Sequence, residues 1–168
     1  IASSVIHLAF KDHNSEFKQL PDEAAVLDAM RRANAGPGFY YFPYAGTMKV
    51  MGSPEMTEKY TRGPVGTANI KPAGPPAMGK NLLLWFIYSV VVGVFAGYLA
   101  SRTLAAGTHY LQVFRVVGCA SFMAYSLAHF SDAVWKMKPW SMTLKHVFDG
   151  LVYALLTAGV FGWLWPQP

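Results

Sequence analysis

The stretch that decides the fold is NLLLWFIYSVVVGVFAGYLAS, residues 81–101, which carries no charged side chain. Lys80 precedes it and Arg102 follows it. An α-helix rises about 1.5 Å per residue, so this stretch is long enough to cross a hydrocarbon core about 30 Å thick. Two further long apolar segments follow it, and three such segments within residues 81–168 are typical of spanning helices rather than of a soluble core.

We therefore predict an all-α membrane protein with three spanning helices, at about residues 81–103, 109–131 and 142–165. These helices form a transmembrane bundle. The chain opens with the apolar phrase IASSVIHLAF, residues 1–10, which is typical of the end of a further transmembrane helix at the N-terminus. A complete protein of this kind would have four spanning helices.

Residues 11–80 are predicted to form an extramembrane segment with short helices and an extended arm rich in proline and glycine. The sequence Pro-Asp-Glu at 21–23 is typical of a first helical turn, and Ser53 is a good N-cap for a second short helix. The phrase FYYFPY at 39–44 favours an edge strand or an extended loop. This segment has too few aliphatic residues for a large core of its own. We expect it to lie on the membrane or on a partner.

Composition narrows the function classes. Of the 168 residues, 53% are hydrophobic and 14% are charged, and a single cysteine is present. One cysteine excludes a disulfide scaffold or a multi-cysteine metal centre among these residues. The net charge of +5 does not form a basic patch, because the cations of the first 80 residues are interleaved with acidic residues. We therefore expect no binding to nucleic acid.

The cations near the predicted helix ends indicate an orientation. On the side of the extramembrane segment they outnumber those on the other side, where we find only Arg102 and Arg115. Cytoplasmic loops carry the excess of lysine and arginine, so the polar segment is predicted to be cytoplasmic. The lysines on its side are Lys11, Lys71, Lys80, Lys136, Lys138 and Lys145.

The best candidate for chemistry is a doubled H-x-x-D motif. His129 and Asp132 lie near the end of the second predicted helix, and His146 and Asp149 lie near the start of the third. Residues at i and i+3 share one face of a helix, and the short connection brings both pairs to a similar depth. Two imidazoles and two carboxylates are suitable ligands for a divalent metal.

Other interpretations of the same four residues stay open. His129 and His146 could bind a haem, a quinone or a pigment, or could relay protons, because ionisable groups inside a membrane are functional candidates by default. They could equally be structural, since placing charged and polar groups at the level of the lipid headgroups costs little free energy. No C-x-x-C-H motif is present, so covalently attached c-type haem is excluded.

Small and aromatic residues mark surfaces for packing. Small residues allow helices to approach closely, either within the chain or against a partner. The candidates are Gly93, Gly97, Gly118, Gly159 and Gly162. Tryptophans near predicted helix ends are typical of an interfacial aromatic belt, with a stacking platform for a pigment or quinone as the alternative. These are Trp85, Trp135, Trp140, Trp163 and Trp165.

Four phrases carry a resemblance to a known family. LPDE (20–23), GPPAMGK (74–80), SLAHFSDAVW (126–135) and KHVFDGLVYALLTAGVFGWLWP (145–166) resemble an uncharacterised family of small bacterial inner-membrane proteins. The resemblance covers most of the chain. It implies a bacterial origin, a location in the inner (cytoplasmic) membrane and a short N-terminal anchor helix. It supplies no activity that could be transferred to these residues.

These patterns predict an accessory role rather than catalysis. No nucleophile elbow, zinc-protease, P-loop or dinucleotide motif is present, so we do not expect an enzyme. We expect a non-catalytic accessory subunit of a larger respiratory or photosynthetic membrane complex, which contacts lipid and docks on other subunits through small-residue helix faces and the extended arm. The alternative is a membrane protein that binds a metal, haem, pigment or quinone through His129 and His146, with Asp132 and Asp149. A small transporter ranks third, because no pair of broken helices is seen.

Overall fold

The computed structural model describes residues 16–167, which fall into two compact units. One, which we call the extramembrane unit, is Lys18–Pro75. The other, the membrane unit, contains the chain from Pro76 onward together with Glu16 and Phe17. The predicted N-terminal helix end at residues 1–10 lies outside the described residues.

Three helical segments of the membrane unit are long and apolar enough to cross a bilayer. They are α5 (Met78–Thr103), the consecutive helices α6 (Tyr110–Ser126) and α7 (Ala128–Trp135), and α8 (Trp140–Leu164). This confirms the prediction of an all-α membrane protein with three spanning helices. The ends differ from the predicted ranges by a few residues, and the chain is a multi-pass membrane protein.

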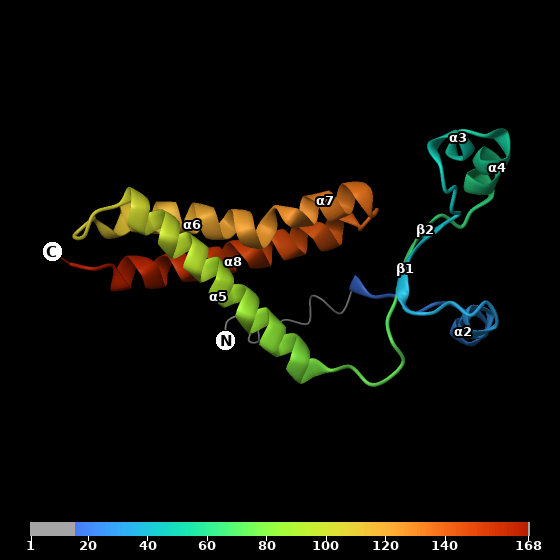
Figure 1. Cartoon of the computed structure of the whole chain (residues 1–168), viewed down its shortest axis with the longest axis horizontal. Helices are drawn as coiled ribbons and strands as arrows, with labels where there is room; N and C mark the ends of the chain where they lie inside the picture. The colour runs from blue at the N-terminus through green and yellow to red at the C-terminus, as the bar shows by residue number, and fades with distance from the viewer. Residues whose placement is uncertain (1–15, 168) are drawn as a thin grey trace. The chain divides into compact units, whose positions relative to one another are not determined.

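Helices α6 and α8 pack side by side along most of their length (Figure 1). Close approach is possible because small residues face each other: the Cβ of Ala158 on α8 lies against Gly118 of α6. Nearer the other end, a Cβ added to Gly150 would overlap the Ser126 hydroxyl. That hydroxyl donates a hydrogen bond across the interface to the Val147 carbonyl, at 3.3 Å.

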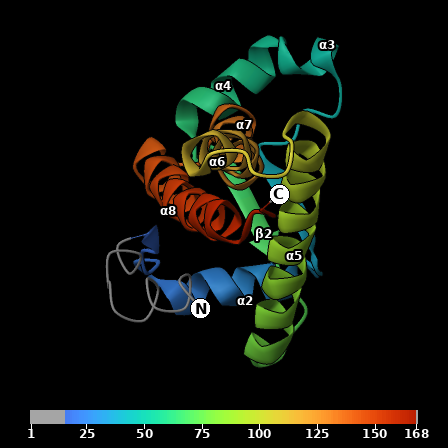
Figure 2. The same ribbon diagram turned by 90° about the vertical axis from the view of Figure 1, so that its left-hand side faces the viewer.

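Helix α5 joins this pair at one end and diverges at the other. Ala96 and Ala100 are fully buried in the core that α5 shares with α6 and α8, and a Cβ on Gly97 would come within 2.9 Å of the Phe161 ring. Toward the start of α5, larger side chains replace these small ones, including Trp85 and Tyr88. The helix therefore crosses α6 and α8 at an angle (Figures 1 and 2).

The large side chains at the open end form an aromatic cluster. The ring of Trp85 lies 5.9 Å from that of Tyr153 on α8 and 6.4 Å from that of Tyr125 on α6, centroid to centroid. Tyr88 packs edge-on against Tyr125 and donates a hydrogen bond to the Ala124 carbonyl at 2.6 Å. These rings bridge a separation too wide for alanine or glycine, so they determine how far α5 stands from the pair.

The extramembrane unit begins with α2 (Glu23–Arg32) and contains α3 (Met48–Met51) and α4 (Pro54–Arg62). Both helices foreseen in this segment are present. The Asp22 carboxylate caps α2 by accepting from the Ala25 amide at 3.2 Å, and Ser53 caps α4. On α4 the Lys59 ammonium, 2.7 Å from the Glu55 carboxylate, lowers the pKa of that carboxyl group.

A two-stranded antiparallel ribbon completes the extramembrane unit. Strand β1 (Gly38–Phe42) pairs with β2 (Gly66–Ile70), with Tyr40 opposite Ala68. The sequence predicted an edge strand or an extended loop at residues 39–44, and the structure has a strand there, Gly38–Phe42. The second was not, because a single short run of small residues gives no periodic signal before its partner is known. In Lys18–Pro75 only one hydrophobic side chain, Met56, is buried.

We predict that Gly150→Ala will destabilise the membrane unit by about 1–3 kcal/mol, since the new methyl group must displace Ser126 or the main chain of Tyr125. Thermal or denaturant unfolding in detergent, followed by circular dichroism, measures this. Gly93→Ala is the matched control: nothing lies within 4 Å of that position, so helix propensity alone should leave its stability equal or slightly higher. Equal stability of both variants would contradict the packing described.

Candidate functional site

The structure brings together the two histidines of the doubled H-x-x-D motif. His129 lies on α7 and His146 on α8, and their rings stack with centroids 5.0 Å apart and an interplanar angle of 25°. Both side chains are half-buried. The close packing of Ser126 against Gly150, one helical turn from each histidine, holds the two helices at this distance.

A third ionisable residue joins this pair from far away in the sequence. The Glu16 carboxylate lies 3.3 Å from Nε2 of His146, and its side chain is only 5% exposed. No sequence pattern pointed to Glu16, because nothing in its local sequence indicates that it will meet a residue 130 positions later. The contact attaches the chain just before the extramembrane unit to the start of α8.

The two aspartates have different environments, although the motifs look alike. Asp132 is partly exposed and lies 2.7 Å from the ammonium of Lys136, one turn later on the same helix. Asp149 is buried, with 7% of its surface exposed. It lies nine residues beyond Trp140, about 14 Å along the axis of α8, a helix long and apolar enough to span a membrane. A buried carboxyl group within such a helix is a functional candidate.

The geometry limits which ligands this cluster could hold. Within residues 16–167 no group of three or more histidine, cysteine, aspartate or glutamate side chains is arranged to hold a metal ion. The predicted metal set of His129, Asp132, His146 and Asp149 therefore gains no support from the described part of the chain. As placed, the imidazoles contact each other and leave no space between them for a haem plane. Binding to one imidazole, or to one face of the pair, stays a prediction.

The five predicted tryptophans have different environments, and the interfacial belt stays a prediction. Trp135, Trp140 and Trp163 are exposed at helix ends, as an interfacial belt requires. The indole of Trp165 donates to the Ala105 carbonyl at 2.9 Å and so ties the end of α8 to the α5–α6 loop. Trp85 instead belongs to the aromatic cluster between α5 and α8.

Most of the predicted packing glycines face other helices of the same chain. Gly97, Gly118 and Gly162 each approach a side chain of a neighbouring helix, and Gly159 lies farther from one, with the Tyr110 hydroxyl 3.7 Å from its added Cβ. Gly93 has nothing within 4 Å. The tightest position is Gly150, which the sequence analysis did not select, since a lone glycine after H-x-x-D has no recognisable spacing.

Comparisons with protein families, curated proteins and solved structures found no match to this chain. The resemblance to a bacterial inner-membrane family is therefore a prediction.

We predict that His129→Ala will lower the free energy of unfolding by about 0.5–1.5 kcal/mol, through loss of the stacked ring. His129→Phe should restore most of this, because phenylalanine keeps a flat ring against His146. Unfolding in detergent measures both variants. If His129→Phe is as unstable as His129→Ala, the nitrogen atoms of His129 matter to the fold and not only its ring.

Proposed function

We propose that this chain is a non-catalytic accessory subunit of a larger bacterial membrane complex, respiratory or photosynthetic. One observation carries the proposal: the extramembrane unit of 58 residues, Lys18–Pro75, buries a single hydrophobic side chain. Folding cannot offset the conformational entropy of so many residues with so little buried apolar surface. A neighbouring surface must supply the missing burial.

Exposed side chains around α3 are suited to a protein neighbour. Tyr44 and Met48 are about 80% exposed, and Val50 and Met51 are also exposed. Methionine is flexible and polarisable, and it is used often at binding surfaces that adapt to a partner. We call these four residues the α3 surface.

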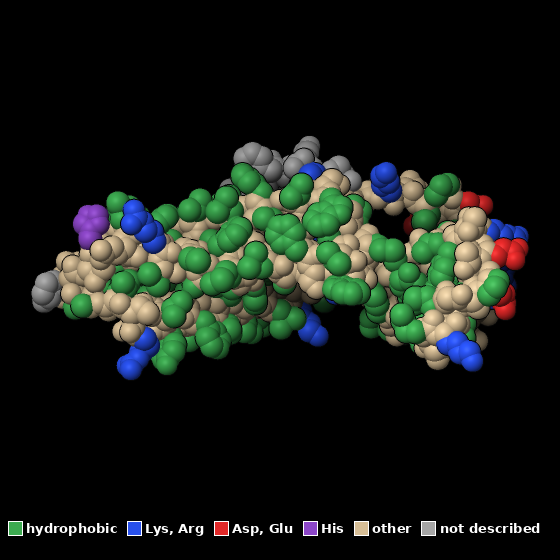
Figure 3. All heavy atoms as spheres, turned by 90° about the horizontal axis from the view of Figure 1, so that it is seen from above, with side chains coloured by type: hydrophobic (Ala, Val, Ile, Leu, Met, Phe, Trp, Pro, Cys, Tyr) green, Lys and Arg blue, Asp and Glu red, His purple; other side chains and the backbone are tan. Residues whose placement is uncertain are grey.

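Helix α5 offers a second docking face in the bilayer. Only 11% of its apolar window is buried within the chain, against 28% for each of the other two spanning segments. Figure 3 shows hydrophobic side chains spread over the surface of the membrane unit. Gly97 of α5 packs against Phe161 of the same chain, whereas Gly93 has no neighbour within 4 Å. The Gly93 end of this GxxxG motif can therefore receive a helix of another subunit.

The same proposal places the chain in the bacterial inner membrane with the extramembrane unit in the cytoplasm. Lysines near the membrane on that side, against Arg102 and Arg115 on the other, support this orientation. The resemblance described above supports the choice of membrane.

A second candidate function is the binding of a metal, haem, pigment or quinone at the histidine pair. The buried carboxyl group of Asp149 and the stacked imidazoles favour it. Visible absorbance or stoichiometric metal in the purified protein that disappears in the folded His129→Phe variant would support this function. A colourless, metal-free preparation would count against it.

Docking predicts that gentle detergent extraction from the native host yields the chain with other membrane subunits. Gly93→Leu and, separately, Met48→Ser with Met51→Ser should each reduce the co-purified subunits severalfold while the isolated chain stays as stable as before. Mass spectrometry of the extracted complex measures this. Gly79→Leu is the control, because that position is also open but lies in the first turn of α5. A chain that migrates alone in every detergent contradicts the proposal.

Orientation is tested by labelling with a membrane-impermeant maleimide on a Cys119→Ser background. Thr108→Cys, in the α5–α6 loop, should react in intact spheroplasts. Lys71→Cys should react only after the membrane is opened. The reverse pattern would place the extramembrane unit outside the cytoplasm.

A further inference from the structure

One face of the ribbon carries only apolar and aromatic side chains. Side chains alternate between the two faces of a strand, and residues opposite each other in the register share a face. Tyr40 and Phe42 of β1 therefore lie on the same face as Ala68 and Ile70 of β2, and we call these four residues the ribbon face. Phe39 lies on the opposite face.

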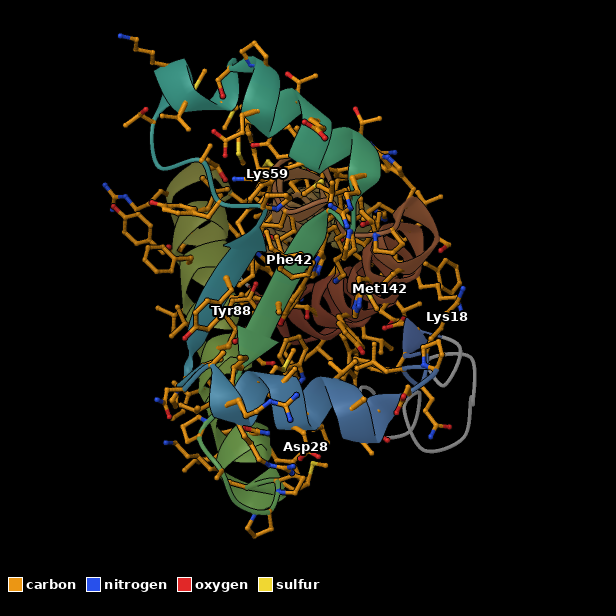
Figure 4. The ribbon with its side chains drawn as sticks, turned by 90° about the vertical axis from the view of Figure 1, so that its right-hand side faces the viewer. Lys18, Asp28, Phe42, Lys59, Tyr88 and Met142 are labelled. Atoms are coloured by element: carbon orange, nitrogen blue, oxygen red, sulfur yellow. The ribbon has the colours of Figure 1, made fainter. Side chains whose placement is uncertain are left out.

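The ribbon face is partly exposed: Tyr40 and Phe42 are exposed, and Ala68 and Ile70 are half-buried. The ring of Tyr40 lies over Gly38, 3.3 Å from where a Cβ would stand. The ring of Phe42, which is labelled in Figure 4, lies over Gly66 at 3.4 Å. Both rings remain more than a third exposed. Within Lys18–Pro75, each strand packs extensively only against the other strand. A ribbon of two short strands is marginal in water by itself, so its order depends on what covers it.

The ribbon is uncharged, and in the sequence both of its strands are flanked by cations, which we call the framing cations. Neither strand contains a charged residue, and the first charge met beyond each of the four strand ends is positive. All four of these side chains are exposed, and none forms an ion pair with a residue of the described chain. Two other cations of the unit, by contrast, are paired: Arg31 with Asp28 and Lys59 with Glu55. The framing cations are Arg32, Lys49, Arg62 and Lys71.

The covalent chain keeps the ribbon near the bilayer. Strand β2 ends at Ile70 and α5 begins at Met78, so eight residue steps join the ribbon to a spanning helix. Even fully extended, these steps reach about 28 Å. On its other side, the unit begins two residues after Glu16, which contacts His146 at the start of α8. The end of β2 is therefore tethered within about 28 Å of the start of a helix that can span this same membrane.

We propose that the ribbon face binds the anionic headgroup layer of the membrane that holds the chain's own helices. Aromatic rings favour the boundary between headgroups and acyl chains, and the framing cations outside α3, Arg32, Arg62 and Lys71, complement negative headgroups. The occupant is an anionic phospholipid surface, and the α3 surface remains for the protein neighbour of the proposed function.

Hydrogen exchange of the full-length chain in lipid nanodiscs tests this. Amides of 38–42 and 66–70 should exchange more slowly in phosphatidylcholine mixed with phosphatidylglycerol than in phosphatidylcholine alone, and high salt should reduce the difference. Arg32→Gln with Lys71→Gln should lower the lipid-dependent protection by on the order of tenfold. Arg31→Gln with Lys59→Gln removes the two cations of the same unit that are paired with carboxylates, and it should leave the protection unchanged.

A pair of phenylalanine variants tests which face of the ribbon contacts the lipid. Phe42→Ser should abolish the extra protection, whereas Phe39→Ser, on the opposite face and even more exposed, should retain it. Amides of α4 report whether the unit is still folded, and the charge variants do not alter the ribbon itself.

Two results would overturn the proposal. One is equal exchange of the ribbon in both lipid compositions. The other is protection in native membranes that is lost in every reconstituted lipid, since a protein would then cover the ribbon face. A failure to co-purify other subunits, by contrast, would contradict the accessory role and leave this result unaffected.

Discussion

The close approach of α6 to α8 at Ser126 and Gly150 is the constraint on which the rest of the membrane unit depends. Because Gly150 has no side chain, the Ser126 hydroxyl reaches the Val147 carbonyl across the interface. One turn away on each helix, His129 and His146 are thereby brought into ring contact. A larger residue at position 150 would separate the histidines as well as the helices, so the candidate site and the fold share one packing contact.

Along α5, side-chain size keeps one end of the helix close to α6 and α8 and the other end apart from them. Small residues such as Ala96 and Ala100 bring the end of the helix into the core, while the rings of Trp85 and Tyr88 hold its start away from α8. The result is a helix with most of its apolar surface facing outward. In a bilayer that surface needs no protein cover, yet the open Gly93 makes it suited to a second helix. The extramembrane unit differs from α5, because apolar side chains that are exposed to water are less stable than apolar side chains that face lipid.

The candidate site shows where sequence reasoning succeeds and where it stops. The spacing of the H-x-x-D motifs and the short connection between the helices predicted that His129 and His146 would meet, and they do. The same symmetry suggested that Asp132 and Asp149 would act alike, but one lies beside Lys136 and the other is buried. Glu16 was not foreseen at all, because a contact across 130 residues leaves no periodic trace in either segment.

The sequence by itself determined that three helices are long and apolar enough to span a membrane, since three long apolar segments within residues 81–168 are typical of spanning helices rather than of a soluble core. It also determined the capped helices of the extramembrane unit, whose signals are local. Only the tertiary structure decided that the strand Gly66–Ile70 exists, that Gly150 is the tightest contact and that Gly93 is open. Each of these depends on which residue stands opposite, and that information is distributed over distant parts of the chain.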